Sequence, residues 1–195
     1  DFTGWESAYF MTLGVSFMAL VSWLIFLPTP ETKAEKAKPF KAAVLFNHYK
    51  DLKFIFSQPG LRWAALGDAW FWSLGGFLWL VLVELAGEVV PGNSGISALY
   101  GWWSLMVGFG IMLGCLFSAY LNHGRVEIGL TAIGGLGMPL SILGLYMADP
   151  ESLYFDCSCN AIGFFGALYF VPLNGQLQNN AENKKRGRVL ASSVL

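Results

Sequence analysis

The stretch LRWAALGDAWFWSLGGFLWLVLVELAGE, residues 61–88, indicates what kind of protein this is. It is long enough to cross a bilayer, because about 20 apolar residues in a helix cover roughly 30 Å. Asp68 lies inside this apolar run. A carboxylate that faced lipid would cost several kcal/mol, so we expect a cavity or a protein partner on the Asp68 side of the helix.

The residues that share a helical face with Asp68 are mostly aromatic or small. At about 3.6 residues per turn, this face carries Asp68, Phe71, Trp72, Gly75, Trp79 and Leu82. The opposite, oily face carries Trp70, Leu74, Phe77 and Val81. In one interpretation Asp68 binds a cation, a proton or a positive headgroup, and the indoles line the path of an amphipathic substrate. In the other, Asp68 pairs with a polar neighbour or stays wet near the interface, and the indoles are packing.

The chain as a whole has the composition of an integral membrane protein. Of its 195 residues, 55% are hydrophobic, 16% aromatic and 13% charged. In a soluble domain about a quarter of the residues are charged. The excess apolar residues are gathered in runs of about 20. We therefore predict an all-α, polytopic transmembrane helical bundle, with the phospholipid bilayer and not nucleic acid as its partner.

Turns and prolines divide the chain into five apolar runs. The predicted spans are residues 7–27, 61–88, 96–120, 126–147 and 153–171, with a sixth beginning at Val189. Pro28 and Pro30 should end the first span and Pro172 the fifth, and Pro139 should kink the fourth. The chain lacks an initial Met, and its first run lacks the basic start of a signal peptide. We interpret it as the middle of a longer protein.

Between the first two spans lies a polar segment rich in lysine. Its lysines are Lys33, Lys36, Lys38, Lys41, Lys50 and Lys53. On a helix, Leu45, Tyr49, Leu52 and Phe56 would fall on one face, with lysines around the rest. This pattern is typical of an amphipathic helix that lies on the membrane surface. A linker helix packed on protein would explain the pattern equally well.

Basic residues occur in alternate connections between the spans. Besides those lysines they are Arg62, Arg125, Lys184, Lys185, Arg186 and Arg188. The other connections carry acidic residues: Asp1, Glu6, Glu88, Asp149 and Glu151. By the positive-inside rule, the side with all the Lys and Arg residues is cytoplasmic.

The remaining features of the spans indicate packing rather than catalysis. Small residues at close spacing favour tight helix contacts: Gly110, Gly114 and Ser118, then Gly134, Gly135 and Gly137, then Gly163 and Gly166. Asn160 is a candidate for the substrate cavity or for a helix–helix hydrogen bond, and Trp102 and Trp103 fit an interfacial belt. The sequence shows no catalytic triad, phosphate loop or metal cluster. We expect a protein that is not an enzyme and has no cofactor or metal.

The order of helices around one long basic loop resembles the major facilitator superfamily. This resemblance makes residues 1–27 the last helix of the N-terminal half, 28–59 the cytoplasmic loop between the halves, and 60–195 the start of the C-terminal half. The spans would be about the sixth to tenth helices. A gating turn follows the eighth helix in this superfamily, and Gly124, Arg125 and Glu127 are its candidates here. Leu121 and Asn122 depart from the usual charged motif.

Three local motifs resemble the lysophospholipid transporter family more closely. They read DAWFWSLG at residues 68–75, GRVEIGL at 124–130, and VPLNGQLQ at 171–178 followed by RGRVLA at 186–191. They also resemble the transporter part of proteins that fuse such a domain to a glycerophospholipid acyltransferase. The family usually carries a small neutral residue where Asp68 stands here.

This resemblance implies a secondary transporter that moves lysophospholipids across the bacterial inner membrane by alternating access. The implied partners are a lysophospholipid, the missing N-terminal half and a fused or neighbouring acyltransferase. Two alternatives stay open. The protein could export drugs or other small amphiphiles, or it could be a membrane module attached to an acyltransferase.

The charge pattern makes a prediction about membrane topology. Cysteines introduced at positions 36 and 185 of the full-length protein should be protected from an impermeant reagent added outside, and one at position 93 should be labelled. Intact cells labelled before and after permeabilisation provide the measurement. Labelling from outside at position 36 or 185, but not at 93, would contradict the predicted orientation.

Overall fold

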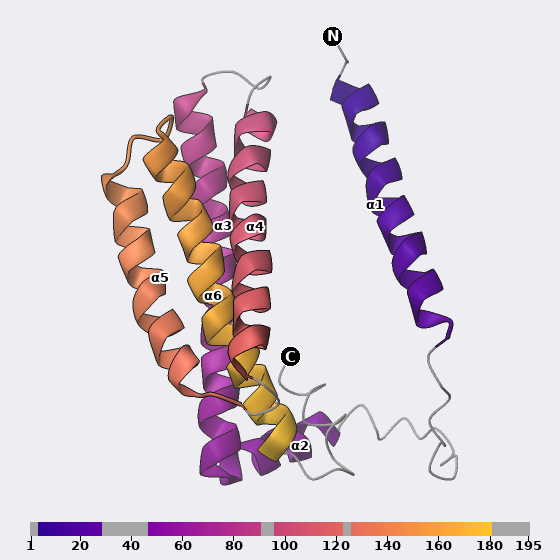
Figure 1. The fold of residues 1–195 in the computed structure, drawn as a ribbon, viewed down its shortest axis with the longest axis vertical. Coiled ribbons are helices and arrows are strands. Elements are labelled where there is room, and N and C mark those ends of the chain that lie inside the picture. The colour runs from indigo at the N-terminus through magenta and orange to yellow at the C-terminus, as the bar shows by residue number, and fades with distance from the viewer. Residues whose placement is uncertain (1–3, 29–46, 91–95, 123–125, 181–195) are drawn as a thin grey trace. The chain divides into compact units, whose positions relative to one another are not determined.

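The computed structural model describes residues 4–28, 47–90, 96–122 and 126–180. These residues form six helices and no strand (Figure 1). In chain order the helices are α1 (Gly4–Phe26), α2 (Asn47–Ser57), α3 (Pro59–Val89), α4 (Ile96–Asn122), α5 (Gly129–Met147) and α6 (Leu153–Asn180). The predicted all-α class is confirmed.

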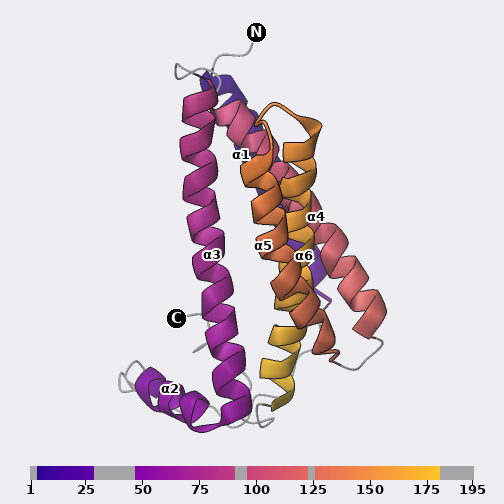
Figure 2. The same cartoon turned by 90° about the vertical axis from the view of Figure 1, so that its left-hand side faces the viewer.

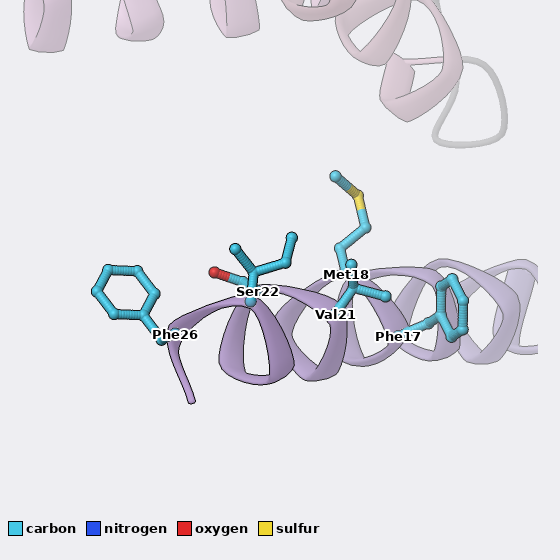
Figure 3. A pocket seen from close by; sticks show the side chains of 6 residues that line it. Phe17, Met18, Val21, Ser22 and Phe26 are labelled. Atoms are coloured by element: carbon cyan, nitrogen blue, oxygen red, sulfur yellow. The ribbon is translucent and has the colours of Figure 1, made fainter. Parts of the chain in front are cut away.

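Helix α1 belongs to a separate compact unit, Asp1–Lys41, and is described by itself. Its 23 residues would extend over about 35 Å, and its apolar part, Thr12–Phe26, has exposed side chains. Figure 3 shows Phe17, Met18, Val21, Ser22 and Phe26 around a hollow of about 300 Å³. All residues that line the hollow come from this one helix, so it is a surface indentation and not an enclosed site.

Four helices of the second unit are long and apolar enough to cross a membrane. They are Pro59–Val89, Ala98–Asn122, Gly129–Met147 and Leu153–Asn179. They alternate in direction along the chain (Figure 1). The exposed basic residue Lys53 and the half-buried Arg62 therefore lie at one end of this bundle, and Glu88, Asp149 and Glu151 at the other. This arrangement agrees with the predicted segregation of charge.

The prediction that Pro172 ends the last span is wrong, because α6 continues through it to Asn180. Pro172 is fully buried, and packing by neighbouring helices is what lets a helix tolerate a proline. Beyond it, Leu173 and Leu177 lie one turn apart and are both buried. Their burial against α2 and α3 stabilises helical structure in a segment that reads as polar in the sequence.

Helix α6 is the central helix of the second unit and packs against α3, α4 and α5 (Figures 1 and 2). Its contact with α4 brings backbone against backbone. A Cβ atom on Gly110 would collide with the backbone oxygen of Asn160, and one on Gly163 would collide with that of Val107. Glycine at these crossing points is therefore what permits the approach, as the small-residue pattern predicted.

The contact of α5 with α6 has the same character. A Cβ atom on Gly134 would collide with the backbone of Phe165 and Tyr169, and one on Gly137 would enter the Phe165 ring. Both glycines are buried, and both come from the cluster noted in the sequence. Helices α4, α5 and α6 thus form a closely packed group of three.

A separate hydrophobic cluster lies at the acidic end of the bundle. It consists of Leu82, Ala86, Trp103, Leu145, Phe155, Cys159 and Ile162. Trp103 is 1% exposed and its ring centroid lies 4.7 Å from that of Phe155. The assignment of Trp103 to an interfacial belt is therefore wrong, because this indole belongs to the core. Trp102 is exposed and donates a hydrogen bond of 3.0 Å from Nε1 to Asp156 Oδ2.

The α4–α6 contact predicts different effects for two glycines of the same helix. Gly110→Ala should lower the free energy of unfolding by about 1–3 kcal/mol, because the new methyl group collides with the α6 backbone. Gly108 has nothing within 4 Å of its Cβ position, so Gly108→Ala should be neutral or stabilising by up to about 1 kcal/mol. Unfolding of the full-length protein in mixed micelles measures both. Equal effects of the two variants would contradict the packing described.

Candidate functional site

The candidate site is centred on Asp68, in the third turn of α3. This residue lies about 14 Å from the start of the helix and is 2% exposed. Its carboxylate does not face lipid or open space, because α6 covers it. The sequence-based expectation that Asp68 needs a cavity or a protein partner is met by a protein partner within this chain.

Two side chains of α6 hydrogen-bond the segment of α3 around Asp68. Asn174 donates a long hydrogen bond of 3.5 Å from Nδ2 to Asp68 Oδ1. Tyr169 donates one of 3.2 Å from its hydroxyl to the carbonyl oxygen of Gly67. A Cβ on Gly67 would lie only 2.8 Å from the Tyr169 hydroxyl oxygen, so glycine at this position permits the approach. The two bonds fix the register of α6 on α3.

Aromatic rings border the carboxylate on the side toward the membrane interior. Phe71 stacks on Phe170 with ring centroids 4.8 Å apart and on Tyr169 at 6.2 Å. Trp72 meets Phe71 and Phe170 edge-on, each at 5.7 Å. The Trp72 side chain is 58% exposed, so this aromatic cluster extends from beside Asp68 to the surface of the described bundle.

Apolar side chains close the site on the side toward the basic end. The cluster there consists of Ile55, Leu61, Ala64, Leu173 and Leu177. It joins α2, the first turns of α3 and the last turns of α6. Asp68 therefore lies between an apolar cluster and an aromatic cluster, with an amide as its hydrogen-bond partner.

Among the described residues, no basic side chain pairs with the Asp68 carboxylate to neutralise its charge. Arg62, the nearest basic residue in the α3 sequence, places Cζ 5.2 Å from the ring centroid of Trp63. Nε of Arg62 is buried without a hydrogen-bond partner among those residues. A buried carboxylate held by a single long bond from an amide is costly to keep ionised. The arrangement suits a group that exchanges a proton or receives a cation.

Of the α3 residues that the sequence assigned to a cavity face, some are buried in the structure and others are exposed. Asp68, Phe71 and Leu82 pack against the bundle, whereas Gly75 and Trp79 are exposed. Gly75 has nothing within 4 Å of its Cβ position, and the Trp79 ring contacts Tyr100 at 5.6 Å. Leu74, assigned to the oily face, is half-buried. The buried side of α3 therefore includes Leu74 and follows the line of α6 and α4.

Asn160 does not join this site. It lies in α6 but 14 residues before Asn174, which is about 21 Å along the helix. Its Nδ2 donates a hydrogen bond of 3.2 Å to the carbonyl oxygen of Met106 in α4. Of the two interpretations that the sequence left open, the helix–helix hydrogen bond describes its contacts in this structure.

The structure describes only some residues of the predicted gating turn. Gly124 and Arg125 lie outside the described residues. Glu127 is exposed, and its backbone N–H donates a hydrogen bond of 2.8 Å to Oδ1 of Asn122. Next to it, Val126 lies 3.0 Å from the Cβ position of Gly175. The turn therefore contacts α6 one residue after Asn174, at the same end of the helix as the candidate site.

Asn174 and Tyr169 belong to the site, although no pattern in the sequence pointed to either residue by itself. The position of Asn174 could have predicted its role, because this polar residue directly follows the last apolar run, in the VPLN motif. Helices α3 and α6 run in opposite directions, so the last turns of α6 lie at the depth of the first turns of α3 (Figure 1). Asp68 near the start of one helix predicts a polar partner near the end of the other.

The described residues also bear on two other kinds of site, a metal centre and a second pocket. No group of three His, Cys, Asp or Glu residues there is placed to hold a metal ion. Cys115, Cys157 and Cys159 are free thiols. A second hollow of about 300 Å³ between α5 and α6 is lined by Ser141, Tyr154 and Ser158 among others. Ser141 and Ser158 already donate their hydroxyls to carbonyl oxygens of their own helices.

Comparison with known proteins identifies the family. The family model of the Major Facilitator Superfamily matches residues 1–194. No curated protein and no solved structure matches the chain. The family match and the four apolar helices together indicate a multi-pass membrane protein. The finer resemblance to lysophospholipid transporters stays a prediction.

The site predicts an energetic coupling between Asp68 and Asn174. Asn174→Ala should lower the free energy of unfolding by about 1–3 kcal/mol, because it leaves a buried carboxylate without its partner. In the Asp68→Leu background the same change should cost clearly less, since no carboxylate remains. A double-mutant cycle on the full-length protein measures the coupling. An Asn174→Ala cost that is equal in both backgrounds would show that the two side chains do not interact.

Proposed function

The chain belongs to the Major Facilitator Superfamily, a family of secondary membrane transporters, and from this premise we propose that its cargo is a lysophospholipid. The full-length protein would move the lipid across the bacterial inner membrane by alternating access, with the N-terminal half supplying the other side of the cavity. The lipid would then serve a fused or neighbouring acyltransferase. The proposal rests on the three sequence motifs and on one structural observation.

The observation that carries the proposal is the pairing of a buried carboxylate with an aromatic surface. A lysophospholipid has one acyl chain and a charged headgroup, so it needs an apolar path beside a polar pocket. Trp72 offers an exposed aromatic surface that is continuous with Phe71 and Phe170. Asp68 lies behind these rings, one turn away on the same helix. An ammonium headgroup could be recognised by the rings and by the carboxylate together.

The arrangement also suits a mechanism with two states. Asp68 is covered in the present arrangement, and its hydrogen-bond partner is one side chain, Asn174, of a neighbouring helix. Movement of α3 against α6 would uncover the carboxylate toward the cavity, where it could take a proton, a cation or the headgroup. The hydrogen bond from Tyr169 to Gly67 would break in the same movement.

Export of drugs or other small amphiphiles is the alternative that the same site allows. An aromatic wall beside a carboxylate binds amphiphilic cations of many shapes. Competition experiments on the full-length protein separate the two substrate classes. Inhibition of labelled lysophospholipid uptake by unlabelled lysophospholipid, but not by a cationic dye, favours the lipid.

The proposed role of Asp68 predicts a loss of transport without a loss of structure. Asp68→Asn should lower lysophospholipid uptake at least about tenfold, because the amide keeps the shape and removes the charge and the exchangeable proton. Uptake of labelled lysophospholipid into spheroplasts, at matched membrane levels of full-length protein, is the measurement.

Trp70→Phe provides the matched control. Trp70 is exposed on the same helix, two residues from Asp68 and on the opposite face, so the change should leave uptake nearly unchanged. Equal uptake by Asp68→Asn and wild type would reduce Asp68 to a structural role. Absence of lysophospholipid uptake by the wild-type protein, with export of amphiphilic cations instead, would overturn the lipid assignment.

A further inference from the structure

Helix α2 lies across the start of α3 at a steep angle to the long helices (Figure 2). If the long helices cross the bilayer, α2 lies close to the plane of its surface. It stands at the end of the bundle that carries Lys53 and Arg62. The orientation of α2 is therefore the one that an interfacial helix would have.

One side of α2 is packed on protein. Ile55 is fully buried in the cluster with Leu61 and Ala64 of α3 and Leu173 and Leu177 of α6, and Phe54 packs against this cluster. This contact settles part of the question that the sequence left open, because α2 is attached to the bundle. It also fixes which way the rest of the helix faces.

A second apolar side of α2 is left open. Tyr49 is 76% exposed and Phe56 46% exposed, although both are large and mostly apolar. Seven residues apart, they lie two turns from each other on one face, beside the half-buried Leu52. The exposed Lys53 lies next to this face. The apolar arc of α2 is thus wider than its contact with α3.

Charge and position favour an anionic lipid surface as the occupant of the open face. Residues 29–59 contain six lysines and three acidic residues, so the segment is basic. Trp63, exposed in the next helix, is a residue type enriched at the membrane–water interface. A basic segment beside aromatic side chains, at the end of a bundle of spanning helices, is complementary to an anionic lipid leaflet.

We propose that the Tyr49–Phe56 face of α2 docks on the anionic cytoplasmic leaflet, with these two side chains about 5–10 Å deep at the headgroup and acyl-chain boundary. The Ile55 side holds the helix to the start of α3, and Lys53 contacts lipid phosphates. The leaflet thereby supports the segment that covers the Asp68 site from below. This role is independent of the substrate that the protein transports.

Depth measurements on the full-length protein test the proposal. Single cysteines at positions 49, 56 and 57 are introduced after replacement of the native cysteines, and each is labelled with an environment-sensitive fluorophore. Ser57 is the control on the same helix, because it is exposed at the end of α2 and lies roughly 100° around the helix from Phe56. The protein is reconstituted in vesicles of phosphatidylcholine alone or mixed with phosphatidylglycerol, with and without brominated acyl chains.

Labels at 49 and 56 should show blue-shifted emission and quenching by bromolipid, and both effects should be larger with phosphatidylglycerol. The label at 57 should show little of either. Lys53→Gln should reduce the dependence on phosphatidylglycerol. Labels at 49 and 56 that are blue-shifted but not quenched would mean that protein covers the face, either the other half of the transporter or a second copy. Emission typical of water at both positions would also overturn the proposal.

Discussion

Close backbone contact between α6 and its neighbours is the constraint on which this structure depends. Gly110 and Gly163 let α4 and α6 meet backbone to backbone, and Gly134 does the same for α5. In a bilayer, lipid tails are as apolar as the side chains, so helices associate through close packing more than through the hydrophobic effect. Glycine at the crossing points therefore places α6 in the middle of the bundle, and every feature of the candidate site follows from that placement.

Asp68 is the clearest consequence of a central α6. A carboxylate in an apolar run is costly in lipid, and in this structure α6 supplies Asn174 as its hydrogen-bond partner, while the Tyr169 hydroxyl bonds the neighbouring Gly67. The same helix carries Leu173 and Leu177, which close the site from below and hold Ile55 of α2. One helix thus supplies the polar partner, the aromatic border and the apolar base.

The sequence predicted the positions of the spans well, because hydropathy is a local property of the chain. Three of the spanning helices begin and end within a few residues of the predicted limits. Local patterns failed where a neighbour decides the outcome. Pro172 is typical of a helix end, yet α6 continues beyond it because Leu173 and Leu177 are buried there. Trp103 is a residue type typical of the interface, yet it packs against Phe155 in the core. Helical periodicity predicts which residues share a face of α3 with Asp68. Which of these residues are buried depends on the position of α6, which the α3 sequence does not contain.

The contacts of α6 differ in kind, and this difference bears on how the site could work. Toward α4 and α5 the contact includes backbone against backbone at Gly110, Gly163 and Gly134, which leaves little room for sliding without a change of register. Toward α3 it is made by side chains, with the Tyr169 hydroxyl and Leu173 against Gly67, and the Phe71 ring against Gly166. Side-chain contacts can be exchanged by changes of rotamer, so α3 can shift against a group of three helices that keeps its shape. In such a shift Asp68 would move with α3 and its partner Asn174 would stay with the group of three helices, so a change of state would break the hydrogen bond between them.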